Sequence, residues 1–67
     1  MFGLSKEQKV ANFLMKDTKQ LDYNLAAKIV SLAHMVGGKE DLKNMLMACY
    51  MVNITLETAS DIISAIK

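Results

Sequence analysis

The sequence predicts an all-α protein, a compact bundle of four short helices that forms a single helical domain over residues 1–67. Three observations support this prediction. Apolar residues recur at helical spacing along most of the chain, and no segment alternates apolar and polar residues for long, as a half-buried strand would. Proline is absent, and the three glycines stand at positions 3, 37 and 38. The only internal interruption by these helix-breaking residues is therefore the pair at 37 and 38.

The first helix is expected from about residue 5 to residue 16. Ser5 can cap its N-terminus, and Gln8 follows three residues later, which is the spacing of a capping box. Apolar residues then recur at i, i+3 and i+4, so they share one face of the helix. These residues are Val10, Phe13 and Leu14. The polar stretch 17–20 separates this helix from the next.

The second helix is expected from about residue 22 to residue 36, with Asp22 or Thr18 as its cap. An apolar stripe at i, i+4, i+7 and i+11 supports it. The stripe consists of Leu25, Ile29, Leu32 and Val36. We expect Gly37 and Gly38 to end this helix, because glycine adopts the left-handed conformation after a last turn without a steric penalty.

The third helix is expected from about residue 39 to residue 52, with Glu40 and Asp41 in its first turn, where carboxylates favour the positive end of the helix dipole. We expect Asn53 to end it in a left-handed turn and Ile54 to enter the core. Thr55 can then cap a fourth helix that reaches about residue 66. The apolar face of that helix comprises Leu56, Ala59, Ile62, Ile63 and Ile66.

The most informative segment is the unbroken apolar run from Met45 to Val52. A helix that is apolar on every side must be covered on every side, so the sequence predicts that the third helix is the central and most buried element. A chain of 67 residues has little material for that cover. We therefore expect a homodimer, with an interface near the third and fourth helices. The expected interface residues are Met47, Tyr50, Met51, Ile54, Ile63 and Ile66.

Composition points in the same direction. The single cysteine, Cys49, permits no internal disulfide, so self-association is the remaining device by which so small a protein gains stability. The net charge is +1 and all basic residues are lysines, which gives no large field toward nucleic acid or an anionic membrane. No apolar run approaches the length of about 18–20 residues that spans a bilayer. With no signal-peptide pattern, we expect a cytoplasmic protein without a membrane partner.

An alternative function comes from residues 42–66. The residues from Asn53 to Ile63 resemble the turn and second helix of a helix-turn-helix, in which a small apolar residue and a Ser/Thr cap follow the turn. This resemblance implies a DNA-binding transcriptional regulator. The exposed residues of the reading helix would include Glu57 and Asp61, and two carboxylates close to DNA phosphates would repel the duplex. Nucleic-acid binding is therefore disfavoured.

The sequence indicates no catalytic, metal or cofactor site. His34 and Cys49 are single residues of their kinds, and a catalytic cysteine needs a base within hydrogen-bond reach. The segment Gly37–Gly38–Lys39 is too short for a phosphate-binding loop. We expect a structural cysteine, an exposed or capping histidine, and no enzyme activity.

The function that the sequence favours is protein–protein interaction. We expect a small regulator or inhibitor from a bacterium or phage, which associates with itself and with another protein that the sequence does not identify. Methionines at positions 45, 47 and 51 suit such a surface, because the flexible thioether adapts to a partner. The acidic pair Glu57 and Asp61 is a second contact surface, suited to a basic partner.

Overall fold

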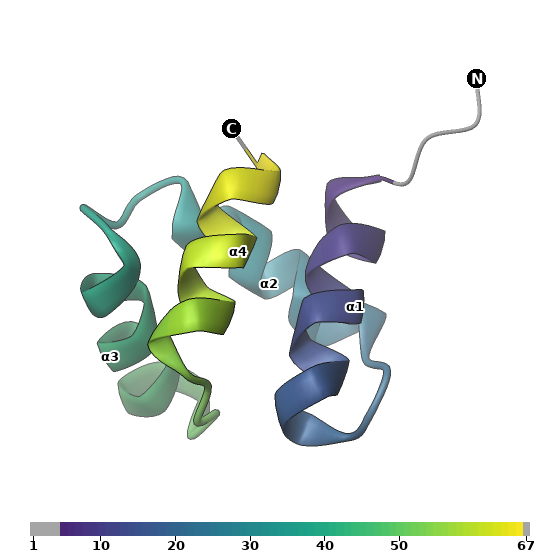
Figure 1. Cartoon of the computed structure of the whole chain (residues 1–67). Helices are drawn as coiled ribbons and strands as arrows, with labels where there is room; N and C mark the ends of the chain where they lie inside the picture. The colour runs from purple at the N-terminus through teal and green to yellow at the C-terminus, as the bar shows by residue number, and fades with distance from the viewer. Residues whose placement is uncertain (1–4, 67) are drawn as a thin grey trace.

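A computed structural model describes residues 5–66 of the chain, and within this range the protein folds into four α-helices and no strand (Figure 1). The helices are α1 (Lys6–Thr18), α2 (Tyr23–Ala33), α3 (Lys39–Tyr50) and α4 (Leu56–Ile66). The prediction of an all-α fold is therefore confirmed for the described residues.

Three of the helices begin at the capping residues that the sequence predicts. Ser5 and Gln8 form a reciprocal capping box, in which each side chain accepts the backbone N–H of the other, at 3.1 and 2.9 Å. The Asp22 carboxylate accepts an N–H of the first turn of α2 at 3.0 Å. The Thr55 hydroxyl accepts an N–H of α4 at 3.1 Å. These bonds satisfy donors that the first turn of a helix leaves without partners.

The end of α2 differs from the prediction. The helix stops at Ala33, before the expected Val36, and neither Gly37 nor Gly38 has a positive φ. Gly37 instead lies close to the exposed Asp41 side chain. Its N–H donates to the Asp41 carboxylate at 3.3 Å, and a Cβ added at Gly37 would lie 3.0 Å from the same oxygen. The loop therefore contains no left-handed glycine, and the close neighbour of Gly37 is the end of a flexible side chain.

The core is shared unequally among the helices. Alanines at the contacts between helices are fully buried, and their small side chains let the helices pack closely. The buried residues of α1 are Val10, Ala11 and Leu14, and those of α2 are Ala26, Ile29, Val30, Leu32 and Ala33. The α4 helix adds Thr58, Ala59, Ile62 and Ile66, and the preceding loop adds Ile54. The α3 helix adds only Leu42 and Leu46.

The α3 helix does not occupy the central position. The α2 and α4 helices each contact all three other helices, whereas α3 packs mainly on α4, to a smaller extent on α2, and not on α1. Figure 1 shows α3 at one side of the molecule, with α4 between it and α1. The prediction that the third helix is central and most buried is therefore wrong. The radius of gyration, 10.7 Å, is close to the value of about 11 Å expected for a compact domain of this length.

Candidate functional site

The most unusual surface of the protein is the outer side of α3. Leu42 and Leu46 are completely buried, but most of the apolar run that follows is not. Met51 is 85% exposed, Met47 46% and Tyr50 38%. The fold of one chain therefore leaves these three side chains uncovered. This agrees with our expectation that a single chain of this size is too small to cover them.

Two opposite faces explain this exposure. At 3.6 residues per turn, Leu42 and Leu46 share the side of α3 that faces α4. Residues at i, i+3, i+4 and i+7 form a second stripe, about half a turn away from the buried side. This stripe, which we call the α3 stripe, consists of Asn44, Met47, Ala48 and Met51, and all four residues are exposed.

The turn after α3 fixes the position of Met51. Met51 has a left-handed backbone conformation, with φ of 56°, and its N–H donates to the Met47 carbonyl at 3.1 Å. The expected left-handed residue was Asn53, so that prediction is corrected by two positions. For a residue with a Cβ this conformation costs about 1–2 kcal/mol. The chain accepts this cost at a position where the side chain gains almost no packing within the protomer.

Hydrogen bonds hold the same turn against the rest of the fold. The Lys43 ammonium donates to the Asn53 side-chain oxygen at 3.1 Å and also to the Ile54 carbonyl. The Thr55 N–H donates to the Asp17 carboxylate at 3.0 Å, which ties the start of α4 to the end of α1. The α3 stripe is therefore presented by a well-anchored helix rather than by a loose loop.

An apolar recess lies beside the stripe, where α3 meets the segment that follows α2. Its volume is about 340 Å³. Its lining includes Met35, whose side chain is 77% exposed, and the polar residues Asp41 and Asn44. The full lining comprises Leu32, Met35, Val36, Gly37, Asp41, Asn44 and Met45.

The predicted interface residues separate into two groups. Met47, Tyr50 and Met51 lie together on α3 and are exposed. Ile54 and Ile66 are only 2% and 4% exposed, because both are enclosed by the shared core, so they offer almost no surface to a second chain. The expected interface is corrected accordingly, and these two residues are removed from it.

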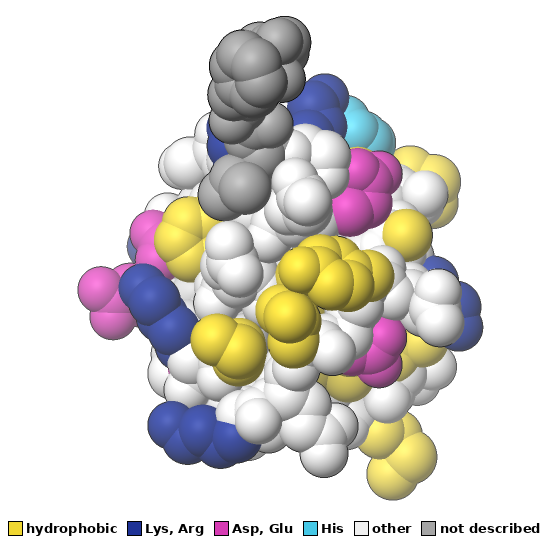
Figure 2. Space-filling view, turned by 90° about the vertical axis from the view of Figure 1, so that its right-hand side faces the viewer, with side chains coloured by type: hydrophobic (Ala, Val, Ile, Leu, Met, Phe, Trp, Pro, Cys, Tyr) yellow, Lys and Arg dark blue, Asp and Glu magenta, His cyan; other side chains and the backbone are white. Residues whose placement is uncertain are grey.

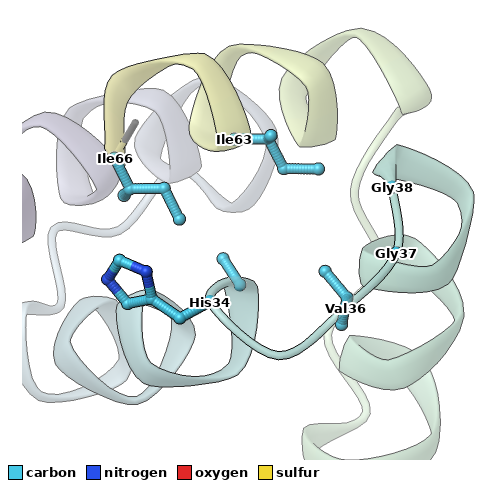
Figure 3. A pocket seen from close by; sticks show the side chains of 7 residues that line it. His34, Val36, Gly37, Gly38, Ile63 and Ile66 are labelled. Atoms are coloured by element: carbon cyan, nitrogen blue, oxygen red, sulfur yellow. The ribbon is translucent and has the colours of Figure 1, made fainter.

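Ile63 has an intermediate position. It is half-buried against the core and borders a second recess, of about 240 Å³, between the end of α2 and the end of α4. Figure 3 shows Ile63 and Ile66 on α4 across this recess from His34, at the C-cap of α2. This second recess lies apart from the α3 stripe, because none of the residues that line the recess belongs to α3.

Sequence reasoning assigned Met45 to the methionine-rich surface but missed three other exposed residues, Met35, Asn44 and Ala48. The spacing of the α3 stripe could have indicated Asn44 and Ala48, because a polar and a small residue complete its i, i+3, i+4, i+7 pattern. For Met35 no sequence signal was available, since its exposure depends on the early end of α2.

Exposed apolar side chains also occur away from α3. Met15, Leu21 and Tyr23 are exposed on α1, on the following loop and on α2. Figure 2 shows the side of the molecule nearest α1, where a cluster of hydrophobic side chains is bordered by polar and charged ones. The α3 surface differs because its exposed apolar residues follow one another along a single helix.

The remaining sequence candidates do not gather into a reactive site. Among residues 5–66, no group of three or more His, Cys, Asp or Glu side chains could hold a metal ion. Cys49 is exposed in the last turn of α3. Glu57 is exposed and Asp61 half-buried, one turn apart on α4.

In comparisons with known proteins, no family model matched the chain, and no curated protein or solved structure was significantly similar to it. Within residues 5–66, no helix combines the length and the hydrophobicity that crossing a membrane requires.

Proposed function

We propose that the protein is a binding module, rather than an enzyme, that associates with other protein chains through the outer surface of α3. It acts as a small regulator or inhibitor in the cytoplasm of a bacterium or in a phage-infected cell, and it forms a homodimer. The observation that carries the proposal is the joint exposure of Met47, Tyr50 and Met51 on a helix that buries only two of its side chains.

The driving force is the removal of this surface from water. Burial of apolar surface contributes about 25 cal/mol per Å². The total accessible area, 4400 Å², is close to the area of about 4200 Å² expected for a folded monomer of this mass. What distinguishes the protein is therefore the clustering of apolar side chains on one helix, which is typical of interaction sites, and not the amount of surface.

Tyrosine and methionine suit such a contact. The Tyr50 ring lies 5.8 Å from the ammonium of Lys28 on α2, so it has a partner within the protomer that limits its motion. Methionine side chains remain flexible and polarisable, which lets one surface fit more than one partner. A rigid aromatic group beside adaptable thioethers supports both self-association and the binding of a second protein.

The acidic pair on α4 is a proposed secondary contact. Glu57 and Asp61 are spaced by four residues and therefore lie on the same side of α4. A partner with basic groups would gain association rate and specificity from this pair.

The alternative, DNA reading by residues 42–66, has less support. The candidate reading helix, α4, contacts all three other helices, and its first turn carries Glu57. Lys43, one of the two lysines on the preceding helix that could contact phosphate, is hydrogen-bonded to the 53–54 turn. A duplex would therefore meet carboxylates on α4 and few available cations on α3.

Sedimentation equilibrium tests the proposal. We expect the wild-type protein to dimerise at micromolar concentration and the Met51→Asp variant to be monomeric, because a carboxylate there would be buried without a partner. Met15→Asp is the matched control, since Met15 is also an exposed methionine but lies on α1. A wild-type monomer would count against self-association. Retention of duplex DNA at low salt, lost as salt rises, would favour the alternative.

A further inference from the structure

We draw no further inference here: the strongest candidate, the exposed α3 stripe with the apolar recess beside it, carries none, because nothing in the structure shows what covers this surface.

Discussion

Replacing Met51 with glycine is expected to stabilise the protomer and weaken its self-association at the same time. Met51 has φ of 56°, a conformation that costs a residue with a Cβ about 1–2 kcal/mol and that glycine adopts freely. The greater freedom of glycine in the unfolded chain offsets part of this gain, by about 0.4–1 kcal/mol. Since the Met51 side chain is almost fully exposed, little packing is lost.

The net gain is therefore about 0.5–1 kcal/mol, which corresponds to a rise in Tm of several degrees for a domain of this size, at about 4–8 °C per kcal/mol. Urea unfolding at low micromolar concentration measures the protomer without the contribution of the dimer. In the same variant, sedimentation at higher concentration is expected to show a larger dissociation constant.

Lys19→Gly is the matched control, because Lys19 is the other non-glycine residue with positive φ among residues 5–66, at 64°, and it lies at the end of α1. We expect it to leave association unchanged. A Met51→Gly protein that is less stable by more than about 1 kcal/mol would contradict the reasoning, since a loss of that size is typical of a packed side chain.

Three further substitutions test the fold on which the surface depends, each by urea denaturation. Leu46→Ala is expected to lower the free energy of unfolding by about 2–5 kcal/mol, because Leu46 is completely buried. Met47→Ala should change it by less than about 0.5 kcal/mol, because Met47 is exposed. Equal effects would contradict the description of α3 as a helix with one buried and one exposed face. Asp22→Ala is expected to cost about 1 kcal/mol through loss of the α2 cap, and no change would mean that water replaces the carboxylate fully. Asp17→Ala removes the acceptor of the Thr55 N–H and should cost about 1–2 kcal/mol, while a neutral result would show that this link between α1 and α4 is dispensable.

Local signals in the sequence were sufficient to place the helix starts. The capping box at Ser5 and Gln8 and the caps at Asp22 and Thr55 depend on residues within one turn of each other, so no knowledge of the tertiary fold is needed. The α4 helix reaches Ile66, the last residue that the structure describes.

The helix ends and the order of packing required information that local patterns lack. Gly37 and Gly38 suggest a left-handed stop, yet neither has a positive φ, and the Gly37 N–H donates to the Asp41 carboxylate. The left-handed residue after α3 is Met51 and not Asn53, and with this turn the chain carries Ile54 into the core.

The position of α3 shows the same limitation at the level of the whole fold. An apolar run predicts that a helix needs cover, but it does not indicate which element supplies it. Here α1, α2 and α4 bury their own stripes together. The α3 helix, which buries only Leu42 and Leu46, packs mainly on α4 and to a smaller extent on α2. The expected exposure of Met47, Tyr50 and Met51 therefore agrees with the structure, although the central position that we assigned to their helix does not.

Methionine methyl NMR over a range of concentrations, from about 10 µM to about 1 mM, tests the self-association of the α3 surface most directly. We expect the methyl resonances of Met47 and Met51 to shift together as the concentration rises, while that of Met15 on α1 stays fixed. Resonances of Met47 and Met51 that remain unchanged across the whole range would contradict the proposed contact between two copies.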